Sequence, residues 1–194
     1  LGLDRNTIVI YTSDHGSHFR TRNSEYKRSC HEASIRIPLV AAGPGLPGGR
    51  VIRDLVSLVD VPPTLLALAG ISGPSCYDGR SLLPLIADKA EEWPDDVFVQ
   101  ISESQVGRAV RTRRWKYGVK APDRNGWTDP DATRYREQYL YDLESDPYEQ
   151  HNLVREASTE PVRAELRARL VQRMVAAGEQ APEISAAEEH ADGR

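Results

Sequence analysis

Residues 6–16 read Asn-Thr-Ile-Val-Ile-Tyr-Thr-Ser-Asp-His-Gly, and they decide how the first half of the chain is interpreted. Residues 7–12 form a continuous apolar, β-branched run, which is typical of a strand buried on both faces of a parallel sheet. The run stops at polar residues and a glycine, where such a strand would reach the edge of its sheet. We therefore predict a buried strand whose carboxyl end carries Asp14 and His15.

Further strands and a helix follow along the chain. Residues 37–42 predict a second short buried strand, and residues 51–59 predict a third. Asp60 then predicts a helix N-cap, and the helix over 64–69 closes at Gly70. Strands that alternate with helices are typical of an α/β layer fold.

The pattern changes near residue 94. From there several strand-like runs follow one another with no helix between them, which predicts an antiparallel sheet. These runs are 97–102, 108–112, 115–119 and 138–143. Residues 160–177 show a helical period, and we expect that helix to pack on the small sheet.

The chain is therefore expected to have three parts. Residues 1–93 form the α/β part, residues 94–178 form the small antiparallel sheet with its helix, and residues 179–194 form a flexible tail. The chain begins with Leu1 rather than Met, and Gly2 reads as the cap of a helix that lies before it. We expect the chain to be one piece of a longer protein.

Composition excludes several classes of protein. The 194 residues carry a net charge of −4, which gives no electrostatic basis for nucleic-acid binding. The two cysteines, Cys30 and Cys76, make neither a disulfide framework nor a zinc module. No apolar run approaches the roughly 20 residues that span a bilayer. The basic cluster at 111–116 lies in a strand-like stretch, where alternate charges usually coat a solvated face.

Asp14, His15 and Gly16 form a candidate metal site at the carboxyl end of the first strand. Ligands of open α/β sheets gather at this edge. An Asp supplies hard oxygen and a His supplies nitrogen, and both bind divalent cations. The structural alternative is an Asp that caps the following turn and a His that is half-buried.

Residues 27–38 form a second group, Lys-Arg-Ser-Cys-His-Glu-Ala-Ser-Ile-Arg-Ile-Pro. Lys27 could neutralise an anionic ester as a point charge, although most lysines are solvated surface residues. Glu32 and Arg36 are four residues apart, which suits an ion pair across a helical turn. We expect that pair to brace the turn before the strand at Ile37.

The remaining histidines differ in their expected roles. His18 and His31 are candidates for the substrate side of a site, and His31 could instead support its neighbours. His151 and His190 lie in a loop and in the tail, and we expect no role for them in the chemistry.

Taken together, these motifs resemble those of the sulfatase family, within the alkaline phosphatase superfamily. Residues 6–16 resemble the family's metal-binding strand and loop, and Lys27, Glu32, Arg36 and Pro38 match a family segment in type and spacing. Further segments resemble family signatures in the same order; these are 59–66, 77–82, 108–117 and 140–153.

The resemblance implies a fold and a reaction. The fold would be the C-terminal part of an alkaline-phosphatase-like α/β domain, followed by a small antiparallel sheet packed on a C-terminal helix. The reaction would be hydrolysis of a sulfate monoester by a formylglycine nucleophile. Asp14 and His15 would bind one divalent metal, with Ca²⁺ expected and Mn²⁺ or Mg²⁺ as alternatives, and Lys27 would contact the sulfate.

The chain also departs from the family pattern. The formylglycine arises from a Cys or Ser in a Cys/Ser-x-Pro-x-Arg segment, and neither Cys30 nor Cys76 has that context. The nucleophile and two further metal-binding Asp residues are therefore expected upstream of this chain. Because Asp14 and His15 supply only two ligands, we predict weak or no metal binding and no turnover by the chain alone.

Two alternative functions stay open at this point. One is a phosphatase, phosphodiesterase or phosphonate monoester hydrolase of the same superfamily, because the same metal geometry serves phosphate and sulfate. The other is a non-catalytic binding or structural module. The expected partner is a sulfated small molecule or carbohydrate, with no nucleic acid and no membrane span. The resemblance favours an extracytoplasmic location, and an exposed sheet edge would favour self-association.

Overall fold

The computed structural model describes residues 2–188 and divides the chain into two compact units. Leu1–His15 and Ile37–Asp95 make up the first, which we call the ribbon unit. Gly16–Arg36 and Asp96–Arg194 make up the second, which we call the sheet unit. The division expected from the sequence, at residue 93, places residues 16–36 with the α/β part; here they pack with the antiparallel sheet.

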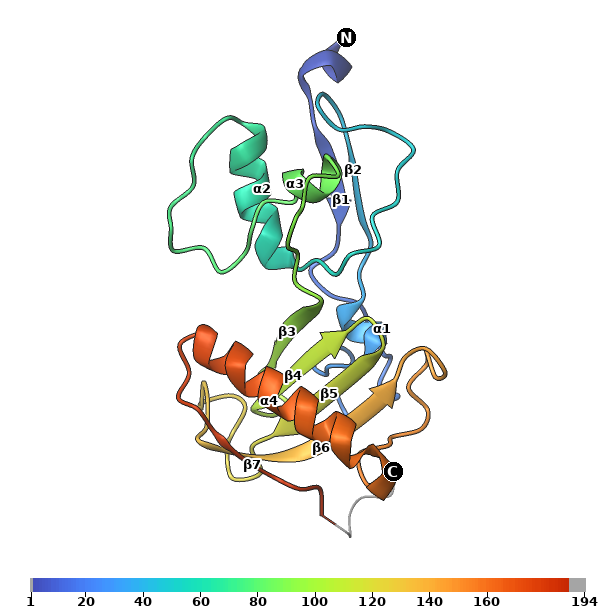
Figure 1. Cartoon of the computed structure of the whole chain (residues 1–194), viewed down its shortest axis with the longest axis vertical. Coiled ribbons are helices and arrows are strands. Elements are labelled where there is room, and N and C mark those ends of the chain that lie inside the picture. The colour runs from blue at the N-terminus through green and yellow to red at the C-terminus, as the bar shows by residue number, and fades with distance from the viewer. Residues whose placement is uncertain (1, 189–194) are drawn as a thin grey trace. The chain divides into compact units, whose positions relative to one another are not determined.

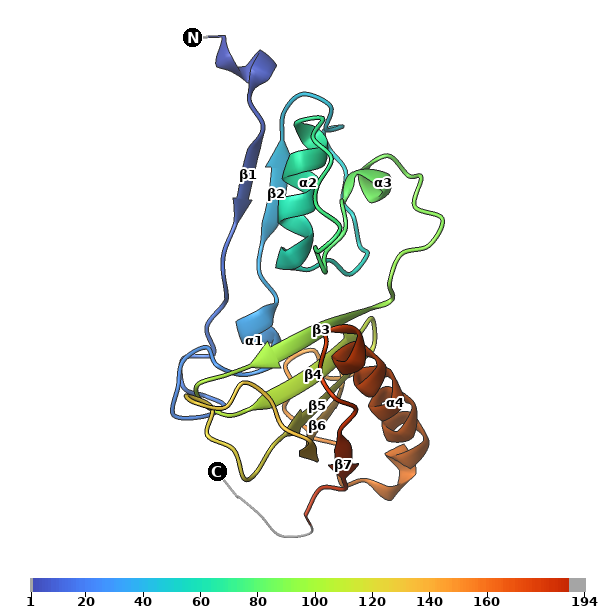
Figure 2. The same ribbon diagram turned by 90° about the vertical axis from the view of Figure 1, so that its left-hand side faces the viewer.

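The ribbon unit contains one pair of strands, β1 (Val9–Thr12) and β2 (Leu39–Ala42). They run antiparallel, with Val9 opposite Ala42 and Thr12 opposite Leu39, as Figure 2 shows. Val9 and Tyr11 are 60% and 67% exposed. The prediction of a parallel strand buried on both faces is therefore wrong for the described residues. Two parallel strands would need a crossover connection between them, usually a helix. Residues 16–36, which connect β1 to β2, belong to the sheet unit instead.

The apolar stretch at 51–59 is not a strand, contrary to the prediction. It is irregular as far as a short 3-10 helix, η2 (Leu58–Asp60). The carbonyl of Leu55 accepts a hydrogen bond from the indole Nε1 of Trp93 at 2.7 Å. In a strand this carbonyl would instead accept from the backbone of a neighbouring strand. Ser57 and Asp60 close a capping box instead.

Helix α2 (Val61–Leu68) follows as predicted and ends before Gly70, which has a φ of 70°. Buried polar contacts hold the next loop against it. Asp60 Oδ1 accepts from the Arg80 backbone N at 2.9 Å, and Thr64 Oγ1 accepts from the Leu82 backbone N, also at 2.9 Å. A Cβ on Gly79 would lie 1.9 Å from the Val59 carbonyl oxygen, so only glycine fits there. Two short helices, η1 (Leu3–Asn6) and α3 (Leu83–Ile86), complete the ribbon unit.

The sheet unit contains five strands in the order β3-β4-β5-β6-β7. All neighbours are antiparallel except β6 and β7, which are parallel. The bounds are β3 Asp96–Ile101, β4 Gly107–Thr112, β5 Trp115–Lys120, β6 Arg134–Asp142 and β7 Glu183–Ser185. The first four overlap the predicted runs, although β6 begins four residues before its predicted run. β7 lies within the stretch 179–194 that was expected to be a flexible tail.

Helix α4 (Glu160–Ala176), preceded by η3 (Ala157–Thr159), lies across one face of this sheet, as Figure 1 shows. Its apolar residues, four apart, bury against alternate residues of the strands; this core includes Leu166, Leu170, Met174, Val110, Tyr117 and Leu140. The opposite face carries a smaller apolar cluster of Cys30, Ile101 and Ala109, with Val99 and Tyr139 against it. Residues 16–36, including α1 (Glu32–Ile35), therefore cover the face opposite α4 (Figure 2). Within the described residues no helix is long and apolar enough to cross a bilayer.

Candidate functional site

Asp14 and His15 lie where the ribbon unit's first strand ends. The Asp14 side chain is 81% exposed, and its Oδ2 lies 3.3 Å from His15 Nε2. Ser13 Oγ donates to the His15 carbonyl at 2.8 Å and so shapes this turn. An oxygen and a nitrogen donor thus lie side by side, and they fit two positions in the coordination of a divalent cation.

A complete metal cage is not present in the part of the chain described here. No three His, Cys, Asp or Glu residues among residues 2–188 come together in a way that could hold a metal ion. Two donors are too few for the six to eight ligands that Ca²⁺ takes. Asp14 and His15 can therefore supply only part of a metal site.

Lys27 lies in a loop of the sheet unit, residues 16–31, which we call the lysine loop. The loop is closed at its neck, because the His18 backbone N donates to the Tyr26 carbonyl at 2.8 Å and Ser17 Oγ donates to the same oxygen at 3.2 Å. Lys27 Nζ lies 5.4 Å from the ring centroid of Tyr26. The contact holds an ammonium group over an aromatic face near the loop neck.

Gly16 fixes where the lysine loop begins. Its backbone N donates to the Ser34 carbonyl at 2.7 Å, and a Cβ at this position would lie 2.1 Å from the Ala33 carbonyl oxygen. Any side chain would push the start of the loop away from α1. The glycine of the Asp-His-Gly motif thus has a clear packing role.

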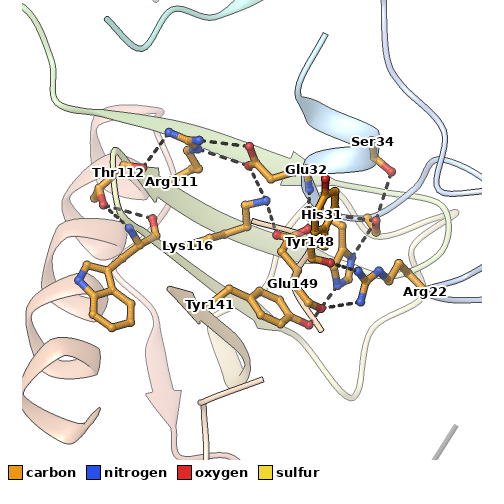
Figure 3. A network of polar contacts seen from close by, with 12 residues as sticks. Arg22, His31, Glu32, Ser34, Arg111, Thr112, Lys116, Tyr141, Tyr148 and Glu149 are labelled. Carbon is orange, nitrogen blue, oxygen red and sulfur yellow. Dashed lines mark hydrogen bonds and ion pairs between the residues drawn. The ribbon is translucent and has the colours of Figure 1, made fainter. Parts of the chain in front are cut away.

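A buried ionic cluster ties the end of the lysine loop to the sheet (Figure 3). Lys116 on β5 is fully buried, and its Nζ lies 2.7 Å from Glu32 Oε1 and 2.6 Å from Glu149 Oε1. Arg111 on β4 reaches both oxygens of Glu32, with Nη2 to Oε2 at 3.1 Å and Nε to Oε1 at 3.3 Å. Two cations and two carboxylates thus balance one another in a buried position.

Glu149 is the centre of a second set of contacts to the loop. Its Oε2 accepts from the Glu32 backbone N at 2.8 Å. Arg22 donates to the carbonyl oxygens of Glu149 at 2.7 Å and Tyr148 at 2.5 Å (Figure 3). Both the middle of the loop and the helix after it are therefore anchored to the turn around residue 149.

The cluster lowers the pKa of Glu32. Burial alone would raise the pKa of this carboxyl, but Lys116 and Arg111 outweigh burial and lower it. Two expectations from the sequence are corrected here. The carboxylate of Glu32 faces Arg111 and Lys116 rather than Arg36, and these two basic residues point into the protein rather than coating a solvated face.

His31 is buried beside this cluster. Its Nδ1 lies 3.1 Å from Ser29 Oγ, its Nε2 lies 3.2 Å from Tyr141 Oη, and its ring packs edge-on against Tyr139 at 4.8 Å (Figure 3). Burial, with Arg22 and Lys116 nearby, lowers the pKa of His31 to about 3, so the ring is neutral at physiological pH. These contacts make His31 a support of the loop, and its contact with substrate stays a prediction.

His18 is also buried, but its environment differs. Neither ring nitrogen has a hydrogen-bond partner within the described structure. Burial is the main reason that the pKa of His18 is lowered. Its substrate-side role also stays a prediction. His151 is 82% exposed on its side chain, whereas His190 lies outside the described residues.

Comparison with known proteins identifies the family. The family model described as N-sulphoglucosamine sulphohydrolase, C-terminal, matches residues 24–176. Arylsulfatase K of Canis lupus familiaris is 37% identical over 163 residues, which cover 79% of this chain and 29% of that protein. The chain belongs to the sulfatase family. It spans less than a third of the length of this curated sulfatase.

Solved structures agree with this assignment of the fold. A protein in complex with its substrate D-glucosamine-2-N,6-O-disulfate superposes with a TM-score of 0.74 at 25% identity, covering 88% of this chain and 34% of that one. A phosphonate monoester hydrolase of Agrobacterium radiobacter gives a TM-score of 0.69 at 26% identity, covering 88% and 35%. The sulfatase chain therefore has the fold that the motifs implied.

The burial of Cys30 argues against this cysteine being a nucleophile in the sulfatase chain. Cys30 is 2% exposed, and burial raises the pKa of its thiol to about 11. Its sulfur lies 3.3 Å from where a Cβ on Gly118 would be, so it fills a gap in the face of the sheet. Cys76 is exposed in the ribbon unit.

The residues that support the lysine loop are the ones that sequence reasoning missed. Lys116 and Arg111 were assigned to a solvated face, and Glu149 and Arg22 were not considered. One signal was available. In the sequence, Lys116 lies between the aromatic residues Trp115 and Tyr117. The structure shows that this strand has consecutive buried residues. A strand that is buried on both faces turns its charged residues inward as well.

Proposed function

We propose that the protein containing this chain hydrolyses sulfate monoesters, with sulfated carbohydrates as the substrate class. The observation that carries the proposal is the match of residues 24–176 to the sulfohydrolase family model, which includes Lys27 and the C-terminal half of the lysine loop. The structural neighbour with a sulfated glucosamine as its substrate supports this substrate class.

In this proposal Lys27 binds the sulfate group. Its ammonium group stabilises negative charge on the ester oxygens as a fixed point charge, without transferring a proton. The closed neck of the lysine loop and the buried cluster behind it hold that charge in place before substrate arrives. Electrostatic stabilisation is most effective when its charges need no rearrangement during the reaction.

Asp14 and His15 would hold one divalent cation together with ligands from outside this chain. The bound cation would supply Lewis-acid polarisation of the ester oxygens. Ca²⁺ is the expected ion, with Mn²⁺ and Mg²⁺ as alternatives. The formylglycine nucleophile is also expected outside this chain.

The decisive experiment measures hydrolysis by the intact protein. It should cleave 4-nitrophenyl sulfate, and Lys27→Ala should lower kcat/KM by roughly 10²- to 10³-fold, the usual loss when a charge-stabilising group is removed. Lys89→Ala is the matched control, because Lys89 is an exposed lysine of the ribbon unit. Equal activity of wild type and Lys27→Ala would exclude the proposed role.

A second candidate function is phosphonate or phosphate ester hydrolysis, which the Agrobacterium neighbour favours. Paired rates on 4-nitrophenyl sulfate and phenyl phosphonate esters separate the two. A higher kcat/KM on the phosphonate would move the assignment to that chemistry.

A further inference from the structure

An exposed tryptophan lies on a rigid loop that contacts the lysine loop. Trp127 is 67% exposed, and it belongs to the loop at 121–133. A single exposed apolar residue is ordinary on a protein surface. Trp127 differs from an ordinary surface residue because its loop is fixed and its ring has a defined partner.

Local hydrogen bonds fix the loop around Trp127. Its backbone N donates to Asn125 Oδ1 at 2.9 Å, and the Asn125 backbone N donates to Asp129 Oδ2 at 3.0 Å. The carbonyl of Gly126 accepts from the Glu103 backbone N at 2.7 Å. A Cβ on Gly126 would lie 2.7 Å from the backbone N of Gln105, so the loop lies directly on the β3–β4 connection.

Arg28 joins this loop to the lysine loop. Its guanidinium carbon lies 5.1 Å from the Trp127 ring centroid, and the group also pairs with Glu25 (2.7 Å) and with Glu103. The Arg28 carbonyl accepts from Asn23 Nδ2 at 3.0 Å and Ser104 Oγ at 2.8 Å. Both the side chain and the backbone of Arg28 are therefore held.

The Trp127 ring contacts the residue that directly follows Lys27 in the chain. Lys27 directly precedes Arg28, so their Cα atoms are about 3.8 Å apart. Arg28 supports the Trp127 ring on one side, and most of the ring's surface remains exposed. Glu25 and Glu103 both pair with the guanidinium of Arg28, and the exposed face of the ring is the apolar part of this group.

We propose that Trp127 is a sugar-stacking residue that binds the saccharide unit next to the sulfated one, and that Arg28 positions it. The apolar C–H face of a pyranose ring packs on the indole, while Lys27 binds the neighbouring sulfate. The inference rests on the proposed function for the role of Lys27. It adds that the substrate is at least a disaccharide, with specificity determined in part by the loop at 121–133.

Binding to the 194-residue chain tests the inference without turnover. The probes are glucosamine-2-N,6-O-disulfate, a disaccharide that contains the same sulfated unit, and inorganic sulfate, each titrated by calorimetry. The disaccharide should bind more tightly than the monosaccharide, and Trp127→Ala should abolish that difference, a loss of about tenfold. Tyr148→Ala is the matched control, since Tyr148 is 75% exposed in the same unit.

Several results would overturn the inference. They are equal loss in Tyr148→Ala, unchanged disaccharide affinity in Trp127→Ala, or binding of an acidic peptide as tightly as the disaccharide. In the intact protein, Trp127→Ala should raise KM for the disaccharide about tenfold and leave kcat and the rate on 4-nitrophenyl sulfate unchanged. If Lys27→Ala keeps full activity, the proposed role of Lys27 fails, yet loss of the disaccharide preference in Trp127→Ala would still support the stacking site.

Discussion

The ribbon unit and the sheet unit differ in what they bury. In the sheet unit, Val110, Leu140 and Leu170 are completely buried in one continuous core. In the described part of the ribbon unit, Leu82 and Leu85 are the buried apolar residues, and buried Asp60 and Thr64 hold its loops by hydrogen bonds. Burial of apolar area is the main stabilising contribution in a folded domain. The sheet unit therefore has its own source of stability, and the ribbon unit has much less.

This difference bears on the two groups of candidate site residues. Lys27 is carried by a loop that lies on the sheet core and is pinned by Glu32 and Glu149. Asp14 and His15 follow a two-stranded ribbon whose side chains at Val9 and Tyr11 are exposed. A two-stranded pair is marginally stable by itself in water. The position of Lys27, the proposed sulfate-binding residue, is thus defined within this chain, whereas Asp14 and His15, the proposed metal ligands, have weaker support.

The largest expected effect comes from breaking the buried ionic cluster. Lys116→Met removes the ammonium group between two buried carboxylates and leaves Glu149 without its cation. Breaking a buried pair by removing one partner costs about 3–5 kcal/mol. Urea unfolding of the chain, followed by far-ultraviolet circular dichroism, should show this loss of unfolding free energy.

Glu144→Gln is the control for the ionic cluster. The Glu144 side chain is 75% exposed and lies 3.6 Å from Arg114, and such surface pairs contribute about 0–1 kcal/mol. If Lys116→Met were as stable as Glu144→Gln, the cluster would not hold the lysine loop on the sheet.

A pair of truncations sharpens the comparison between the units. Leu170→Ala creates a cavity in the core of the sheet unit and should cost about 2–5 kcal/mol. Leu65→Ala on α2 of the ribbon unit should cost less than about 1 kcal/mol, because Leu65 is already 49% exposed. Hydrogen exchange resolved by peptide measures the two units separately. Similar losses for the two variants would show that the ribbon unit has a core comparable to that of the sheet unit.

The sequence predicted those parts of the fold that depend on local pattern. Strands β3 to β6 and helix α4 lie where β-branched runs and the spacing of Leu166 and Leu170 placed them. The direction of β1 against β2 was predicted wrongly, because pairing depends on where residues 16–36 fold and not on the strand itself. Gly70 ends α2 with a left-handed φ, as predicted, whereas the close packing of Gly79 against Val59 was not predicted.

From the sequence, the candidate site could be predicted only as separate short motifs, without the contacts between them. Lys27, Asp14 and His15 were proposed because their neighbours in sequence matched a known pattern, and their roles stay predictions. Lys116 was assigned to solvent because a lysine is almost never buried unless it is paired, and its partner Glu149 lies 33 residues further along the chain. Nothing local to either residue indicates the other, so burial of this pair follows from tertiary structure alone.

The smallest expected effect is a pH dependence of stability that belongs to the sheet unit. The pKa of His31 is about 3 in the folded chain and about 6.5 when unfolded, so between these values the unfolded state binds a proton that the folded state does not. Stability should therefore fall as pH drops below about 6.5, by up to about 1.4 kcal/mol per pH unit. His18, whose pKa is also lowered, adds to this slope with the same sign.

His31→Gln separates the two contributions. Glutamine can still hydrogen-bond to Ser29 and Tyr141 but does not titrate, so the slope of unfolding free energy between pH 7 and pH 5 should become shallower without reaching zero. The window stays above the range where Glu32 protonates, because the pKa of that carboxyl is lowered from 4.5. His151→Gln, at an exposed position, should leave the slope unchanged. A slope in His31→Gln equal to that of the wild type would mean that His31 is not held neutral, and that burial, with Arg22 and Lys116 nearby, does not exclude its proton.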